Sequence, residues 1–400
     1  MQCHRIHVPL IAFAVYANWV VVAEAAREPA IAPALLLYVD ANSDYQEKLR
    51  EYLQARERYE NEAKAYWALV ADKRRSRNAK RRNGEPIALE DYVLMQPPVY
   101  SGPPKPIDPL GAQQEPPPVE KYVPVKADFL NNAAQYFQFV PQQPETEIQY
   151  KRAYAKIAFE VGLTKEQVVR IYAFEAGGDG TYDVQAGLEN PKLGGRAIST
   201  ALGYNQLLNA NSIGLMAEQG DQFISRLKKR SLDAGSRSTA PLEKKIGALE
   251  GMIEFCRSVP DDWSEHENLA KTPKGIGVHA VLLDIDIGPL LQAQKVLQSV
   301  LFAAQKRLQK VLTAAELEMM NLTGDGNGFD IVTMPEDMRD KVPTANFFQP
   351  VGYERNPVAI RHNTVAKLLA ATDAIMDRES ASQGAKGLEA AFLAAEKARR

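Results

Sequence analysis

The stretch VVRIYAFEAGGDGTYD, residues 168–183, contains a glutamate where a helix would be expected to carry an apolar residue. At about 100° per residue, Val168, Ile171 and Tyr172 share one face of a helix, and Glu175 falls within that face. The glycine pair that follows predicts the end of the helix. A carboxyl group beside apolar and aromatic side chains loses hydration, which raises its pKa. The negative end of the helix dipole acts in the same direction.

Glu175 therefore has two interpretations. Near a helix end, its side chain can bend toward solvent and remain an ordinary surface charge. Alternatively, it stays protonated near neutral pH, which is what a general acid that cleaves a glycosidic bond requires. The second interpretation makes Glu175 the candidate catalytic residue.

The composition predicts a globular protein. The chain has 400 residues, of which 45% are hydrophobic and 24% charged, enough for one or two domains with sizeable cores. A formal net charge of −2 gives no sign of the strongly basic domain typical of a nucleic-acid binder, so we expect no nucleic-acid partner. The two cysteines, Cys3 and Cys256, predict no disulfide framework. The five histidines show no metal-ligand spacing, so we expect neither a metal nor another cofactor.

Residues 1–25 have the layout of a secretory signal peptide. A weakly basic start precedes an apolar run of 15 residues, and Ala23-Glu24-Ala25 resembles a cleavage site. The alternative is a membrane anchor, but the run is shorter than the roughly 20 residues that a spanning helix needs. We therefore expect a periplasmic or otherwise exported protein, from which Cys3 is removed with the signal.

Residues 26–96 are expected to form a charged helical region, with an amphipathic helix over 44–72. The basic run KRRSRNAKRR follows at 73–82. One interpretation of this run is a solvated, flexible block of charge. The other is a segment that is attracted to an anionic envelope surface.

Residues 97–125 are rich in proline, which favours extended polyproline II structure. We expect a linker or an arm that lies on the next domain, and through which an envelope protein could bind. Residues 126–375 predict a mainly α-helical domain, with a small β-hairpin or irregular lobe between residues 180 and 208. Residues 376–400 are expected to form a charged, alanine-rich tail.

Three segments of the helical domain follow one another in an order that resembles a known family. They are FEAGG, AISTALGYNQLL and MMNLTGDGNG. Together they resemble the lytic transglycosylases of the lysozyme-like superfamily, in which a helix-terminal glutamate opens an E-S motif. Segments similar to S-x-x-G-A-x-G-L-M-Q and A-Y-N-A-G-x-G follow it. The matching residues are Glu175, Ser199, Gly203, Gln206, Asn321, Gly324 and Gly326, with a looser match at Tyr353.

The resemblance implies a lysozyme-like, α-rich catalytic domain over 126–375. It also implies cleavage of peptidoglycan glycan strands between N-acetylmuramic acid and N-acetylglucosamine. In this family a single glutamate, here Glu175, protonates the leaving oxygen and then helps the muramyl 6-hydroxyl to close a 1,6-anhydro ring. One acid can therefore suffice where most glycosidases use two.

The resemblance further implies a set of substrate-binding residues, namely Ser199, Gly203, Tyr204, Gln206, Asn321 and Tyr353. Two of these have an alternative role. Tyr204 either stacks on a sugar ring or packs in the core. Asn321 either bonds the substrate or caps the loop after its helix.

This chain departs from the family at two points. Ala176 stands where the family has a serine that helps to orient the glutamate. An insertion brings Asp179 and Asp183, either of which could act as a second carboxylate and permit hydrolysis, as in goose-type lysozymes. Both also fit ordinary turn chemistry beside glycine. Because of Ala176, the alternative function is a catalytically inactive lysozyme-like protein that binds peptidoglycan or acts as an envelope scaffold.

Overall fold

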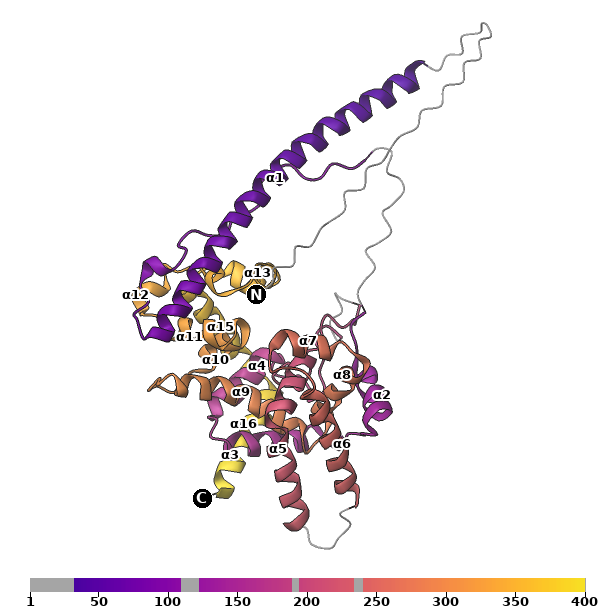
Figure 1. Cartoon of the computed structure of the whole chain (residues 1–400), viewed down its shortest axis with the longest axis vertical. Coiled ribbons are helices and arrows are strands. Elements are labelled where there is room, and N and C mark those ends of the chain that lie inside the picture. The colour runs from indigo at the N-terminus through magenta and orange to yellow at the C-terminus, as the bar shows by residue number, and fades with distance from the viewer. Residues whose placement is uncertain (1–31, 109–121, 189–193, 234–239, 400) are drawn as a thin grey trace, which may run out of the picture. The chain divides into compact units, whose positions relative to one another are not determined.

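The computed structural model describes residues 32–108, 122–188, 194–233 and 240–399 (Figure 1). As predicted, this part of the chain is mainly helical. Extended pairing within it is limited to three isolated β-bridges. The predicted signal peptide, 1–25, lies outside the described residues.

The helices have the following bounds, where η marks a 3₁₀ helix. In chain order they are α1 Ala32–Asn83, η1 Leu89–Asp91, α2 Lys126–Phe137, α3 Glu147–Glu160, α4 Lys165–Glu175, α5 Asn209–Asp233, α6 Ala240–Cys256, α7 Trp263–Ala270, α8 Pro273–Val278, η3 His279–Leu283, α9 Gly288–Gln305, α10 Ala314–Thr323, α11 Asp325–Thr333, α12 Glu336–Arg339, η4 Thr344–Phe347, α13 Pro350–Glu354, α14 Pro357–Arg361, α15 Val365–Ser380 and α16 Gln383–Arg399.

The described residues fall into two compact units. One combines the part of α1 before Arg58 with residues 101–108. The other combines Arg58–Tyr100 with the described residues from Tyr122 onward, and it contains every residue discussed below as part of the site. The division differs from the predicted boundary at residue 96 because the second half of α1 belongs to the core of the second unit.

The second unit has three clusters of buried apolar side chains. The first joins α2, α5, α6 and η3, and it encloses Cys256, whose burial raises the pKa of the thiol to about 12. The second joins α3, α4, α9, α10 and α16. The third joins the second half of α1 to α11–α15. Cys256 is thus a free thiol inside the core.

Helix α4 lies within the second cluster and packs against α3, α10, α15 and α16. Its start is a capping box: the backbone N–H of Gln167 donates to Thr164 Oγ1 at 3.2 Å, and the Thr164 N–H donates to Gln167 Oε1 at 3.0 Å. Ile171 and Tyr172 are buried, as the periodicity predicts. The helix ends at Glu175, and Gly178 follows with a φ of +74°, which favours glycine.

The basic run at 73–82 forms the last turns of α1, so the prediction of a flexible, solvated block is wrong. Arg77 is fully buried. Its Nε lies 3.4 Å from Asp330 Oδ2, and its guanidinium donates to the carbonyl oxygens of Asp91 at 3.0 Å and Asn346 at 3.1 Å. Each of the three guanidinium nitrogens thus has one acceptor, supplied by a different part of the chain. This part of the basic run therefore joins α1 to the rest of the second unit.

The predicted tail, 376–400, is also part of the fold. Helix α15 continues to Ser380, and α16 packs against α3 and α4. Apolar residues at helical spacing make this contact, and they are Ala385, Leu388, Ala391 and Phe392. The alanine-rich composition reflects close helix packing.

Between residues 180 and 208 the described chain is irregular. Gln185 and Leu207 each form an isolated bridge to Leu202, and the remaining residues form turns. Of the two predicted alternatives, the irregular lobe is correct.

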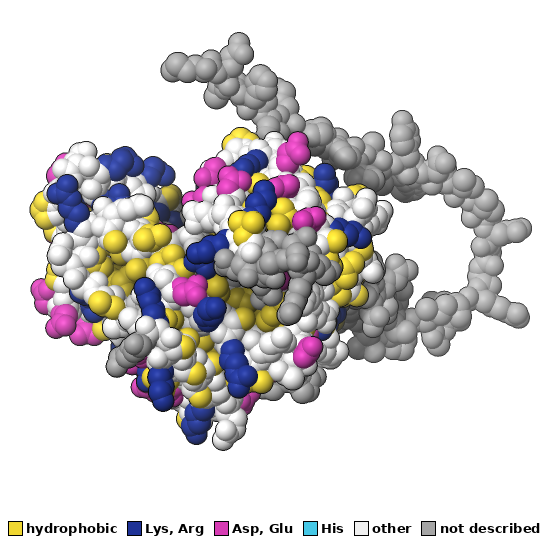
Figure 2. Space-filling model, turned by 90° about the horizontal axis from the view of Figure 1, so that it is seen from below, with side chains coloured by type: hydrophobic (Ala, Val, Ile, Leu, Met, Phe, Trp, Pro, Cys, Tyr) yellow, Lys and Arg dark blue, Asp and Glu magenta, His cyan; other side chains and the backbone are white. Residues whose placement is uncertain are grey.

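Charged and hydrophobic side chains are interspersed over the face that Figure 2 shows. Among the described residues, no single helix is long and apolar enough to span a membrane. The segments Pro273–Leu283 and Gly288–Gln305 are together long and apolar enough, but the chain bends sharply between them.

We expect Asp330→Ala to lower the free energy of unfolding by about 3 kcal/mol or more, because it leaves the buried Arg77 without its carboxylate. Urea unfolding measures this change. The control is Asp72→Ala, which removes an exposed partner of Arg75 and should change the stability by less than about 0.5 kcal/mol. Equal stability of the two variants would contradict the structural role of Arg77.

Candidate active site

A cleft of about 1050 Å³ brings three of the predicted residues together. Glu175, Gln206 and Asn321 all line it. Sites for small molecules have volumes of roughly 300–1000 Å³. The cleft is as large as the largest of these, so a segment of a polymer can enter it. Other helices complete the walls, with α5 contributing Asn211, Gly214, Leu215 and Glu218, α7 contributing Trp263 and His266, α9 contributing Lys295 and Gln298, and α11 contributing Asp325.

Glu175 is the last residue of α4, and its side chain is only partly exposed. The Asn321 Nδ2 group donates to Glu175 Oε1 at 2.7 Å. Asn321 lies near the end of α10, which packs directly against α4. Of the two alternatives for Asn321, the structure supports a role in the cleft.

A second carboxyl group, which the sequence analysis did not identify, lies beside Glu175. Glu318 is fully buried, one helical turn before Asn321 on the same face of α10. Its Oε1 lies 3.5 Å from Asn321 Nδ2, the same amide nitrogen that donates to Glu175. A signal was present, because Glu318 stands between Leu317 and Met319 in an apolar run, as Glu175 does in α4.

Burial dominates the proton affinity of this pair. It raises the pKa of Glu175 to about 7, although the hydrogen bond with Glu318, the charge of Lys295 and the hydrogen bond from Asn321 lower it. Burial also raises the pKa of Glu318 well above its ordinary value, and the charge and hydrogen bond of Glu175 raise it further. At neutral pH the pair therefore holds at least one proton.

The hydrogen bond from Asn321 bears on the departure at Ala176. In the family that the sequence resembles, a serine at this position helps to orient the glutamate. Here Asn321, on α10, donates to Glu175. The orientation of Glu175 thus depends on the packing of α10 against α4.

The α7 wall carries two further side chains. Trp263 is 51% exposed at the start of α7, and His266 is buried one turn later on the same face. An exposed indole in a cleft supplies a large apolar contact surface for a ligand. Neither residue was singled out from the sequence, because a lone tryptophan and a lone histidine form no motif.

Gln206 lines the cleft from an irregular backbone position, with a φ of 42°. Its Nε2 donates to the carbonyl oxygens of Gly203 at 2.8 Å and Val184 at 3.2 Å. The amide nitrogen thus stabilises the loop. Contact with a ligand would come from the amide oxygen.

Ser199 and Gly203 do not line the cleft and support the same loop. The Ala201 N–H donates to Ser199 Oγ at 3.2 Å. Gly203 has a φ of +80°, and a Cβ there would lie 2.3 Å from Gln292 Nε2, so only glycine fits. Both residues shape the loop that carries Gln206, and neither is among the residues that line the cleft.

Tyr204 and Tyr353 are core residues. Tyr204 is fully buried, donates to Glu147, and packs edge-on against Tyr172 with ring centroids 4.6 Å apart. Of its two alternatives, core packing is correct. Tyr353 is buried against Trp67 in the third cluster and does not line the cleft.

Asp179 and Asp183, the predicted second carboxylates, do not line the cleft either. The Asp179 Oδ1 accepts the Gly384 N–H at 2.7 Å, near the start of α16. Asp183 forms an ion pair with Lys126. Burial acts to raise its pKa, but hydrogen bonds from Lys126 and Thr181 outweigh burial and lower it. Both aspartates stabilise the loop after α4, and this agrees with the turn chemistry predicted as their alternative.

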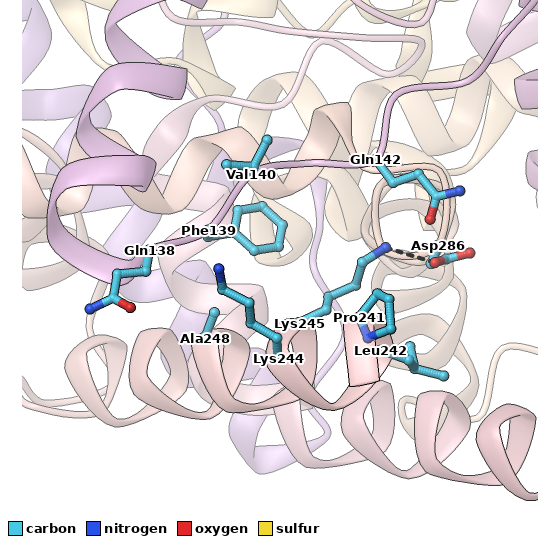
Figure 3. A pocket seen from close by; sticks show the side chains of 10 residues that line it. All are labelled: Gln138, Phe139, Val140, Gln142, Pro241, Leu242, Lys244, Lys245, Ala248 and Asp286. Carbon is cyan, nitrogen blue, oxygen red and sulfur yellow. Dashed lines mark hydrogen bonds and ion pairs between the residues drawn. The ribbon is translucent and has the colours of Figure 1, made fainter. Parts of the chain in front are cut away.

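Another hollow, of about 370 Å³, lies between α6 and residues 138–142 (Figure 3). Lys245 extends into it and pairs with Asp286 at 2.7 Å and with Asp284 at 2.9 Å. Two aspartates thus engage Lys245. The hollow has no lining residue in common with the cleft, and the cleft is therefore the stronger candidate.

Within the described ranges, no group of three or more His, Cys, Asp or Glu side chains is placed to hold a metal ion. No protein-family model, curated protein or solved structure matches this chain. Glu175, Asn321 and Lys295 line the cleft, and Glu318 is buried beside them.

We expect the folded state to lose stability as the pH rises from 5 to 8. In this range an unfolded glutamate is ionised, whereas Glu175 stays protonated until the pH passes its raised pKa of about 7. Its stabilising contribution is thus complete below the unfolded pKa and is lost as the pH rises through 7. The loss should be roughly 2–3 kcal/mol by urea unfolding.

The double variant Glu175→Gln/Glu318→Gln should show a much flatter dependence over the same range. Asp183→Asn is the matched control, because the lowered pKa of Asp183 affects stability only on the acid side. If the double variant kept the slope of the wild type, the buried pair would not be its source.

Proposed function

We propose that this protein cleaves a glycosidic bond in peptidoglycan glycan strands, with Glu175 as general acid and then as base. The observation that carries the proposal is the environment of Glu175. It lies in a cleft of about 1050 Å³, accepts a hydrogen bond from Asn321, and has a pKa near 7 because it is desolvated. An acid with this pKa can both donate and accept a proton at neutral pH.

In the first step, protonated Glu175 gives its hydrogen to the glycosidic oxygen as the bond to the anomeric carbon breaks. The positive charge left on the sugar and the negative charge on Glu175 form together. The Asn321 Nδ2 group and the charge of Lys295 stabilise that carboxylate.

In the second step, the carboxylate accepts the proton of the sugar's own 6-hydroxyl as its oxygen bonds to the anomeric carbon. This closes a 1,6-anhydro ring and returns Glu175 to its protonated form, so no water is consumed. The two aspartates considered for activating a water form contacts with Gly384 and Lys126. Anhydro-ring formation is therefore the proposed outcome.

The proposal assigns the protein to a compartment outside the cytosol, where peptidoglycan lies. It accords with the signal peptide that the sequence predicts at 1–25. The exposed face of Trp263 offers the cleft a surface on which a pyranose ring can stack.

Mass spectrometry of peptidoglycan sacculi incubated with the full chain tests the proposal. We expect anhydro-muropeptides from the wild type, and a loss of at least about 100-fold in their rate of release by Glu175→Gln. The matched control is Glu166→Gln, an exposed glutamate in the first turn of α4, which should keep the wild-type rate.

Unchanged digestion by Glu175→Gln would contradict the role of Glu175. If the wild type sedimented with sacculi but did not digest them, the enzymatic proposal would be overturned. That result would instead favour an inactive peptidoglycan-binding or scaffold protein. Reducing-end products in place of anhydro products would identify hydrolysis.

The rate of cleavage should fall above pH 7, because Glu175 must carry a proton in the first step. A plot of log(kcat/KM) against pH should turn downward near the pKa of about 7 and then approach a slope of −1. A rate that stayed constant up to pH 9 would show that another group delivers the proton.

A further inference from the structure

The mechanism above does not use Glu318. Burying a carboxyl group is costly unless its oxygen atoms are paired, so a fully buried glutamate beside the candidate acid calls for a physical explanation. One possibility is that it is an anion that repels the charge of Glu175. The other is that it is a neutral acid that donates a hydrogen bond.

The hydrogen-bond geometry favours the neutral acid. Oε1 of Glu318 lies 3.5 Å from Asn321 Nδ2. Its Oε2 is buried and, among the described residues, has no hydrogen-bond partner. Asn321 Nδ2 is the donor nearest to both carboxyl groups, and two ionised carboxylates cannot bond to each other, because both only accept. A hydrogen on Glu318 Oε2 would give the pair the donor that it lacks.

The surrounding charges do not favour two anions. Lys295, on α9, is the cation that acts on both carboxyl groups. Glu218 on α5 and Asp325 at the start of α11 add negative charge to the same cleft. On α4 itself, Arg170 is paired with Asp373 and Asp377 of α15. One lysine thus faces several carboxyl groups, so a second buried negative charge would be poorly compensated.

Glu318 does not reach the substrate space. It faces a separate cavity of about 20 Å³, which it shares with Ile171, Asn205, Lys295, Val296, Ser299, Leu317 and Asn321. That volume has room for one water molecule and not for a sugar. Any role of Glu318 in the reaction therefore passes through Glu175.

We propose that Glu318 is a positioning residue, a neutral carboxylic acid that donates its hydrogen from Oε2 to Glu175 and so stabilises the carboxylate that Glu175 becomes. Its role in catalysis rests on the proposed function, but its protonation state and its hydrogen bond do not. Asn321 and Glu318 then act as two donors from one face of α10 that hold the same group.

Two substitutions separate the neutral acid from the anion. Glu318→Gln keeps a donor of similar shape, so the pKa of Glu175 should stay close to that of the wild type. Glu318→Met removes the donor and keeps the volume, so the pKa of Glu175 should rise by about one unit, equivalent to a tenfold change in proton affinity. If Glu318 were an anion, both substitutions would lower the pKa of Glu175.

NMR titration of the full chain, with ¹³C-labelled glutamate carboxyl groups, measures these changes without any assay of activity. Loss of a signal in Glu175→Gln and in Glu318→Gln assigns the two groups. In the wild type, the Glu318 signal should remain that of a protonated acid through pH 8. Titration of Glu318 below pH 6 would overturn the proposal even if Glu318→Met did not fold.

The pH profile of peptidoglycan cleavage provides the catalytic readout. Glu318→Met should move the descending limb to higher pH and lower kcat at pH 6 about tenfold, and Glu318→Gln should restore both. A Glu318→Met profile that superimposes on the wild type would show that Glu318 is only a core residue. If the wild type cleaved nothing, the proposed function would fail while the NMR titration still decided the state of Glu318.

Discussion

The site depends on one interaction, the hydrogen bond of 2.7 Å from Asn321 to Glu175. It joins the end of α10 to the end of α4 at the point where both helices reach the cleft. A carboxyl group left alone in this environment would be desolvated and free to rotate. The amide of Asn321 and the neighbouring carboxyl group of Glu318 restrict the orientation of Glu175. Burial keeps its pKa near 7.

The rest of the fold serves this contact by enclosing α4. Helices α3, α10, α15 and α16 pack against it, and buried tyrosines fill the space behind it. Because these contacts exclude water from the last turn of α4, the burial that shifts Glu175 comes from segments that are distant in sequence. The loop after α4 is likewise stabilised from far away, by the bond between Asp179 and the start of α16.

Periodicity located the parts of the site that obey local rules. The place of Glu175 on the apolar face of α4 and the break after it are properties of a short segment, and the sequence predicted both. Gln206 and Asn321 were found because they belong to motifs. Tyr204 was a poor candidate for stacking because burial of an aromatic ring depends on its tertiary neighbours, here Tyr172 and Glu147.

Glu318 and Arg77 show why the remainder could not be predicted. Each is a charged residue type that is fully buried, and each interacts with a side chain on another element of the chain. Arg77 lies within a run of basic residues, and nothing in that run distinguishes the arginine that is buried from those at the surface. For Glu318, the apolar neighbours were visible, but the partner that explains them lies on α4. Tertiary pairing, which no local pattern encodes, decided both.

The packing of α16 against α4 has a consequence for how the chain matures. Since α16 lies far downstream of α4, the ribosome releases the helix that carries Glu175 long before the helix that covers it. Until then one side of α4 is exposed to water, and a solvated glutamate is ionised at neutral pH. The order of synthesis thus leaves part of the desolvation that raises the pKa of Glu175 to the end of folding, when the last helix packs against α4.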